Sequence, residues 1–246
     1  SEDTETAGLA TLSELLRYGT TTVVEIGGET GVHPETLIEL SKQVGIRLYA
    51  GKGFRSADYV TSQDGQVGYK ERPDKGEKGL QEAVEFAESI LEKKDPAVGA
   101  MLFPLQIDTC EPDLLRETYK QSERLGVLMQ IHGAQGLFEY HQIMQKTGLT
   151  PIQYLDEAGA LGPNTILAHG IFLSSHSWLP YASGDDLERL AASGAALAHC
   201  PVAFARRGIA LESFERYRRA GVRIAIGTDT FPRDMIQEMR WASYIS

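Results

Sequence analysis

The chain has 246 residues, of which 42% are hydrophobic and 24% are charged, and its formal net charge is −10 at pH 7. This is the composition of a folded globular protein, and the length fits one α/β barrel or two smaller domains. The negative charge argues against a surface for nucleic acid or anionic membrane, and no apolar run approaches the roughly 18 residues of a membrane span. The 2 cysteines are too few for a disulfide framework. We therefore expect a cytoplasmic protein.

Helical and extended segments alternate along the chain. Apolar residues at helical spacing, often followed by glycine, predict the helices, and short β-branched or apolar runs predict the strands. The predicted helices are Leu9–Gly19, Pro34–Val44, Leu80–Lys93, Glu111–Gly126, Thr150–Gly162, Asp185–Gly194 and Leu211–Gly221. The predicted strands are Thr20–Ile26, Ile46–Ala50, Val98–Leu105, Val127–His132, Thr165–His169, Ala195–His199 and Val222–Gly227.

Two further segments are assigned neither a helix nor a strand. Phe54–Gly79 is polar and glycine-rich, which indicates a long surface excursion and a candidate lid, and Phe138–Gly148 is expected to be a loop that shapes specificity. The strand–helix alternation predicts a parallel sheet of the (β/α)₈ TIM-barrel type, with seven of its eight strands in this sequence. A dinucleotide-binding fold is disfavoured because no GxGxxG motif joins a strand to a helix.

Four successive predicted strands end in or near a potential metal ligand, at His132, His169, His199 and Asp229. We call the edge where the carboxyl ends of the strands meet the mouth, because barrel enzymes carry their chemistry there. Val127–Ile131 is an apolar run without polar alternation, so we expect it to be covered on both faces and to hold His132 rigidly. Imidazoles with one carboxylate are the ligand set of hydrolytic Zn²⁺ or Fe²⁺ sites.

A histidine at the end of one strand is more often a hydrogen-bonded structural residue. This interpretation is retained for His199, because Cys200-Pro201 predicts a tight turn that its ring packs under. His33, His141 and His176 are expected at the surface. His132, His169 and Asp229 agree in position and chemistry on three separate strands, which favours a shared site.

The motifs IHGAQ, LAHG, AHCP and GTDT resemble the amidohydrolase superfamily, most closely the branch of cytosine, guanine and adenosine-type deaminases and triazine hydrolases. PLQIDTC, at Pro104–Cys110, stands where that branch carries a similar run, and the resemblance extends from about Gly8 to Ser246. It implies that His132 is a direct metal ligand and that Asp229 is both a ligand and the general base. In family members with one metal ion His169 contacts the metal-bound water or the substrate, and in members with two it is a ligand; we include His169 in both the metal site and the substrate site. Family members with two metal ions bridge them with a carbamylated lysine, and no lysine lies in Val98–Cys110. The resemblance therefore implies one metal ion, with zinc expected first and iron as the alternative.

Three positions depart from the pattern of that branch. Gln135 stands where a glutamate transfers protons to the substrate ring, and an amide can hydrogen-bond a substrate but cannot serve as that shuttle. Leu105 replaces a substrate-binding histidine, and Phe204 occupies a position that is commonly polar. We expect all three to contact substrate, in a pocket that is more apolar than usual.

The H-x-H pair that the family carries on its first strand is not in the sequence, nor is the accessory β-sandwich. We therefore interpret residues 1–246 as strands two to eight of the barrel domain of a longer protein. The expected function is hydrolysis, by metal-bound hydroxide, of a C–N or other leaving-group bond in a cyclic or heterocyclic small molecule. The alternative is a catalytically impaired barrel that binds a small molecule or a partner, and homo-oligomers are left open.

Overall fold

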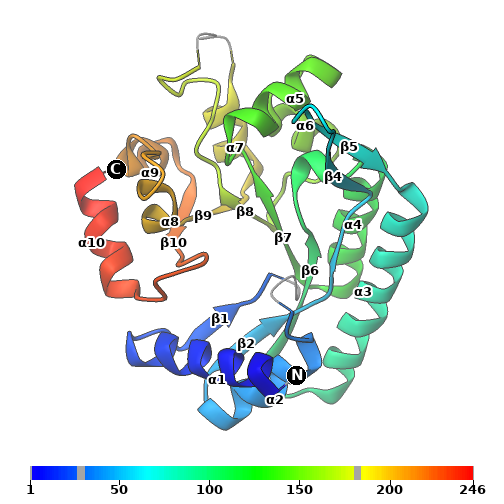
Figure 1. Ribbon diagram of the computed structural model, residues 1–246, viewed down its shortest axis with the longest axis vertical. Helices are drawn as coiled ribbons and strands as arrows, with labels where there is room; N and C mark the ends of the chain where they lie inside the picture. The colour runs from blue at the N-terminus through cyan, green and yellow to red at the C-terminus, as the bar shows by residue number, and fades with distance from the viewer. Residues whose placement is uncertain (1, 27–30, 180–183, 246) are drawn as a thin grey trace.

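The computed structural model describes residues 2–26, 31–179 and 184–245. Its main sheet is parallel and curls through the centre of the molecule, as Figure 1 shows. Each strand pairs with the next in the order β1 (Thr22–Val24), β2 (Arg47–Ala50), β6 (Val98–Pro104), β7 (Leu128–Gly133), β8 (Thr165–His169), β9 (Ala196–His199) and β10 (Arg223–Ile226). The short β3 (Gly53–Phe54) also pairs with β6.

The helices lie around the outer side of the sheet (Figure 1), and those from α2 to α9 stand between successive strands in the chain. Several begin with proline in the first turn and end at a left-handed glycine, as α2 ends at Gly45 and α4 at Gly126. Their bounds are α1 (Glu2–Arg17), α2 (Pro34–Val44), α3 (Pro73–Lys93), α4 (Pro112–Leu125), α5 (Leu137–Thr147), α6 (Pro151–Glu157), α7 (Asp186–Ser193), α8 (Pro201–Ala205), α9 (Phe214–Ala220) and α10 (Met235–Ile245), with a 3₁₀ turn, η1, at Ile107–Thr109. In the described part of the chain, no helix is long and apolar enough to cross a membrane.

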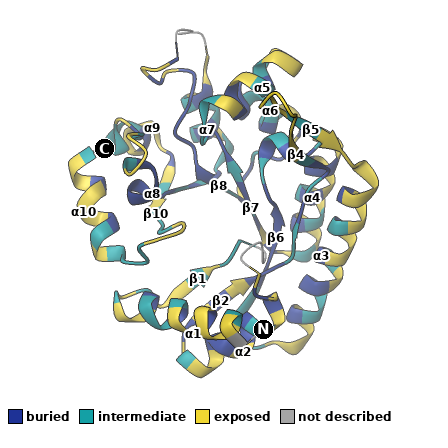
Figure 2. Ribbon diagram, viewed as in Figure 1, coloured by how far each residue is buried: buried dark blue, intermediate teal, exposed yellow. Residues whose placement is uncertain are grey.

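The core lies between the sheet and these helices. Met129, Ile131 and Leu167 are fully buried on the helix-facing side, whereas Leu128 on the opposite face is 37% exposed. Figure 2 shows buried residues between strands and helices and exposed ones on the outer faces of the helices. The expectation that Val127–Ile131 is covered on both faces is therefore wrong for the inner face. The reason is that β1 and β10 pair neither with each other nor with a further strand among the described residues, so the barrel interior is not closed.

The seven predicted barrel strands are all present, in the predicted order, and the partial TIM-barrel fold is confirmed. Phe138–Gly148 is not a loop, because α5 occupies almost all of it. Two predicted helices are shorter than expected, since α6 ends at Glu157 and α9 begins only at Phe214. The tight turn predicted at Cys200-Pro201 is the start of α8.

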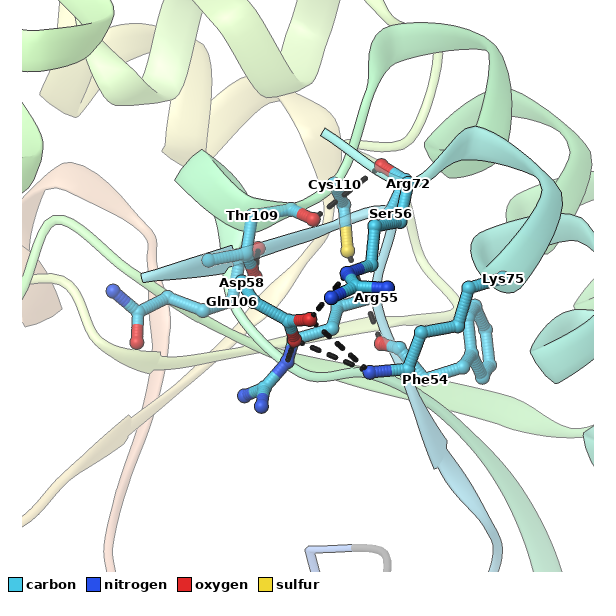
Figure 3. A network of polar contacts seen from close by, with 9 residues as sticks. All are labelled: Phe54, Arg55, Ser56, Asp58, Arg72, Lys75, Gln106, Thr109 and Cys110. Atoms are coloured by element: carbon cyan, nitrogen blue, oxygen red, sulfur yellow. Dashed lines mark hydrogen bonds and ion pairs between the residues drawn. The ribbon is translucent and has the colours of Figure 1, made fainter. Parts of the chain in front are cut away.

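The predicted surface excursion at Phe54–Gly79 is also wrong in detail, because it contains an antiparallel hairpin, β4 (Ala57–Thr61) with β5 (Val67–Glu71), and the start of α3. Figure 3 shows the ion pairs at the base of this hairpin. The carboxylate of Asp58 accepts from Arg55 and Arg72, each at 2.9 Å, and from Lys75 at 3.2 Å. Lys75 first, and then Arg55, lower the pKa of Asp58.

Two histidines outside the predicted ligand set are buried. His176 is 3% exposed, so the surface position expected for it is wrong. Its Nε2 lies 3.2 Å from the carbonyl of Ala210 and its Nδ1 accepts the amide of Trp178, which makes it a satisfied core residue. His199, at the end of β9, is 1% exposed, and burial lowers its pKa to about 4.

The buried His199 gives the fold a specific sensitivity to acid. In the unfolded chain its imidazole takes up a proton below an ordinary pKa of about 6.5, whereas the folded chain resists protonation down to about 4. The burial of neutral His199 therefore stabilises the folded state fully above pH 6.5, and this contribution is lost as the pH falls toward 4. Between pH 7 and 4 we expect the free energy of unfolding of the wild type to fall by about 3 kcal/mol more than that of His199→Gln. Urea denaturation at successive pH values measures the difference, and parallel pH curves for the two proteins would contradict it.

Candidate active site

His132 and His169 meet at the mouth because β7 and β8 pair in parallel register. His132 lies opposite Ala168 and Gly133 lies opposite His169, so the two histidines end neighbouring strands at the same edge. Their rings stack with centroids 5.3 Å apart and an interplanar angle of 20°. The structure thus brings together two residues that are 37 positions apart in the sequence.

The ring of His132 is held by the backbone of Leu105, the residue after β6. Its Nδ1 lies 2.5 Å from the Leu105 carbonyl oxygen, and its backbone amide donates to the same oxygen at 3.2 Å. Because a carbonyl can only accept, Nδ1 carries the proton in this contact. In the neutral ring the lone pair is then on Nε2, the arrangement that metal-binding histidines use.

His169 sits deeper and is 3% exposed. Burial, with smaller contributions from His132 and His199, lowers its pKa well below the usual value, so the ring stays neutral at physiological pH. Its Nδ1 is buried and has no hydrogen-bond partner among the described residues. An unpaired buried nitrogen costs roughly 1–3 kcal/mol, which makes a ligand for this atom the physically reasonable partner.

Phe204, on α8, is 2% exposed and its ring centroid is 4.7 Å from that of His169. It forms an apolar wall beside the imidazole. Leu105 is 8% exposed, and the contact it supplies to His132 is made by its carbonyl. The structure therefore places both residues at the site, and their predicted contact with substrate stays a prediction.

Asp229 follows β10 at the edge of the sheet, where its side chain is exposed. Partial loss of surrounding water raises its pKa above the usual value, and His132 and Arg207 act in the opposite direction. Asp229 therefore lies within electrostatic range of His132. Within residues 2–26, 31–179 and 184–245, however, no three His, Cys, Asp or Glu side chains are close enough together to hold a metal ion. The donor types fit a divalent metal, and the complete ligand set His132, His169 and Asp229 stays a prediction.

Backbone strain is concentrated at these strand ends. Ala134 has φ 52°, His169 has φ 81° and Asp229 has φ 53°, all in the left-handed region that non-glycine residues avoid. Each such residue costs on the order of 1–3 kcal/mol and persists only where surrounding contacts enforce it. Gly170, with φ 53°, continues the left-handed path after His169, and a Cβ there would lie 2.4 Å from Cδ1 of Leu197. Strain of this kind is typical of functional sites.

The contact that enforces the strain at Ala134 comes from Glu139, which the sequence did not single out. Its carboxylate accepts the amides of Ala134 at 2.5 Å and Gln135 at 3.1 Å. A hydrogen bond contributes roughly 0.5–1.5 kcal/mol, so two of them offset the cost of about 1–2 kcal/mol for one left-handed alanine. The sequence signal that could have revealed it is a glutamate in the first turn of α5, the helix that begins directly after IHGAQG.

Asp108 is a second residue that the sequence did not single out. Its Oδ2 accepts the hydroxyls of Tyr59 and Tyr69, both at 2.6 Å, and its Oδ1 accepts from Gln106 at 2.8 Å. Gln106 in turn forms a parallel bridge with His132. The hairpin of β4 and β5 is thus tied through Asp108 to the backbone beside the mouth.

Gln135 lies directly after Ala134 and is half-buried. Its position is defined through its backbone amide by Glu139. Its predicted role as a hydrogen-bonding partner of substrate stays a prediction.

The chain is similar to 5-methylthioadenosine/S-adenosylhomocysteine deaminases. It is 29% identical to that of Pyrococcus furiosus over 238 residues, which are 95% of this chain and 51% of the relative. It is 26% identical to that of Carboxydothermus hydrogenoformans over 248 residues, covering 99% of this chain and 51% of the relative. The chain spans about half the length of these curated relatives.

Solved structures share the fold at lower identity. A zinc-bound adenosine deaminase from Xanthomonas campestris superposes with a TM-score of 0.78 at 20% identity, covering 98% of this chain and 51% of that one. A guanine deaminase from C. acetobutylicum, with guanine in its active site, gives 0.71 at 21% identity, covering 94% and 52%. A zinc-bound atrazine chlorohydrolase from Arthrobacter aurescens TC1 gives 0.72 at 19% identity, covering 91% and 48%.

The sequence matches the model of the Amidohydrolase family over residues 1–246. Together with the curled parallel sheet and the histidines at its carboxyl edge, this match establishes that the chain belongs to the amidohydrolase family.

Proposed function

We propose that this chain forms the larger part of the active site of a metal-dependent hydrolase. Its substrate would be a cyclic or heterocyclic small molecule, and the bond cleaved a C–N bond or a bond to another leaving group. The observation that carries the proposal is the pair of stacked imidazoles at the mouth, one fixed through Nδ1 and the other buried with an unpaired nitrogen. Membership of the family and the deaminase names of the relatives support it.

The metal would be a single divalent ion, zinc in the first instance and iron as the alternative. This chain would supply His132 through Nε2, His169 and Asp229. The chemistry that such an ion supplies is activation of water as a nucleophile near neutral pH. The bound zinc of the adenosine deaminase and atrazine chlorohydrolase structures supports the choice of metal.

Residues of this chain would also accept the proton of the attacking water, orient the substrate and exclude bulk water. Asp229 would accept the proton of the attacking water, and its exposed position would let it return that proton to solvent or to the leaving group. His169 would orient substrate in its neutral form, with Phe204 excluding water on one side. Gln135 and Leu105 would complete the substrate-facing surface. A cytoplasmic location is part of the same proposal.

The side chain of Gln135 limits which leaving groups the proposed reaction can release. An amine leaves a heterocyclic ring only after it has been protonated, whereas a halide leaves as an anion. An amide side chain cannot transfer the proton that an amine requires. We therefore favour a leaving group that needs little protonation.

Gln135 also supports the second candidate, a barrel that binds a small molecule or a partner without turning it over. The absence of a closed three-residue metal cluster in the described ranges points in the same direction. Metal binding and turnover separate the two candidates.

Replacing His132 tests the metal-dependent mechanism. We expect the intact wild-type protein to bind about one zinc ion per chain and to lose turnover when zinc is removed by a chelator. His132→Ala should lose both zinc and turnover, whereas His33→Ala, which changes an exposed histidine without a side-chain capping bond, should keep both. Metal analysis and hydrolysis assays on the same preparations give the answer. Undiminished zinc and turnover in His132→Ala would refute the mechanism, and zinc binding without turnover in the wild type would favour the binding barrel.

Replacing Gln135 by glutamate tests the leaving-group argument. Adenosine and its 6-chloro analogue differ only in the group that must leave, so the ratio of their kcat/KM values isolates the proton requirement. Since general acid catalysis contributes about 10²–10⁴-fold, Gln135→Glu should raise the amino-to-chloro ratio by roughly 100-fold. Gln135→Asn, which keeps an amide, serves as the control. An unchanged ratio in Gln135→Glu would show that residue 135 takes no part in protonating the leaving group.

A further inference from the structure

Glu139 places a carboxyl group in a buried position. It lies in the first turn of α5 and is 2% exposed. Burial, followed by the charge of Asp108, raises the pKa of Glu139 to about 8, and the two amides of Ala134 and Gln135 oppose that rise. The two amides from the loop after His132 are the hydrogen-bond partners that satisfy this buried carboxyl group.

That loop is joined to the loop after His169. The carbonyl of Ala134 accepts the amides of Ile171 and Phe172, both at 2.8 Å, and the carbonyl of Gly133 accepts the amide of Gly170 at 3.0 Å. The left-handed backbone at Ala134, φ 52°, presents its amide to Glu139 and its carbonyl to the other loop. Glu139 thus fixes the segment that follows His132, and this segment is hydrogen-bonded to the one that follows His169.

We propose that Glu139 is a positioning residue, whose carboxylate fixes the backbone of Ala134 and Gln135 and, through the Ala134 carbonyl, the loop that follows His169. Its catalytic consequence rests on the function proposed above. Glu139 acts on the reaction only indirectly, because it contacts the backbone amides of Ala134 and Gln135 and not the imidazoles of the two histidines. Its contribution is to keep Gln135 and the two histidines in one fixed arrangement.

Three variants separate positioning from general stability. Glu139→Gln keeps one acceptor oxygen but turns an amino group toward the second amide. Glu139→Asp keeps the acceptor-only carboxylate on a shorter stem. Asp95→Asn is the control: Asp95 also accepts a backbone amide, that of Ala97 at 2.9 Å, but it lies just before β6, at the opposite end of that strand from the mouth.

Amide hydrogen exchange, read residue by residue by NMR, tests the structural part without any assay. In Glu139→Gln, exchange at Ala134, Gln135, Ile171 and Phe172 should accelerate by at least about ten-fold relative to wild type. In Asp95→Asn, exchange should accelerate at Ala97 and stay unchanged at Ala134 and Gln135. Unchanged exchange at these two amides in both Glu139 variants would overturn the inference, whatever the activity. If Glu139→Gln does not fold, Glu139→Asp decides.

Steady-state kinetics of the zinc-loaded protein, with 6-chloropurine riboside as the probe, tests the catalytic part. Loss of positioning should lower kcat of Glu139→Gln by about 100-fold, with KM changed by less than about three-fold. Glu139→Asp should recover at least roughly ten-fold of the lost kcat, and Asp95→Asn should keep the wild-type kcat. Accelerated exchange with unchanged kcat would overturn the catalytic role. A wild-type protein that hydrolyses nothing would refute the proposed function, while exchange would still decide whether Glu139 positions the loops.

Discussion

A single main-chain oxygen, that of Leu105, fixes the residue on which the site depends. It receives both the amide and the Nδ1 of His132 and so joins the end of β6 to the end of β7. A hydrogen bond of this type contributes only about 1 kcal/mol to stability, so its importance is not energetic. By holding the proton on Nδ1 it leaves Nε2 of the neutral ring as the atom able to bind a metal ion. The apolar side chain of Leu105 is compatible with this role because the contact is made by the backbone.

The rest of the site follows from parallel register and from strain that neighbouring contacts enforce. Pairing of β7 with β8 puts His169 beside His132, and burial keeps its imidazole neutral. The left-handed backbone at Ala134, His169 and Asp229 turns the chain sharply at the ends of β7, β8 and β10. Such turns are unfavourable for a free chain. At Ala134 the cost of the left-handed backbone is offset by the two hydrogen bonds in which Glu139 accepts the amides of Ala134 and Gln135.

The sequence predicted the barrel strands well because each is a short apolar run bounded by a helix end, and strand order follows chain order when crossovers are helical. Its predictions failed where tertiary contacts decide. The hairpin of β4 and β5 is polar and is anchored by the ion pairs of Asp58 and the tyrosine contacts of Asp108, which local patterns do not reveal. Glu139 was missed because the segment Phe138–Gly148 was expected to be a loop, whereas it forms α5 and directs Glu139 to the amides of Ala134 and Gln135. His176 was misplaced because its burial depends on partners such as Ala210, 34 residues away.

The most direct test is the protonation of His132 itself. Nitrogen-15 NMR of the intact protein with labelled histidine, assigned with His132→Ala, reports which ring nitrogen carries the proton before and after zinc is added. We expect the Nδ1–H form without zinc and a shift of the Nε2 resonance when zinc binds, with Nδ1 still protonated. A proton on Nε2, or resonances that zinc leaves unchanged, would contradict the account.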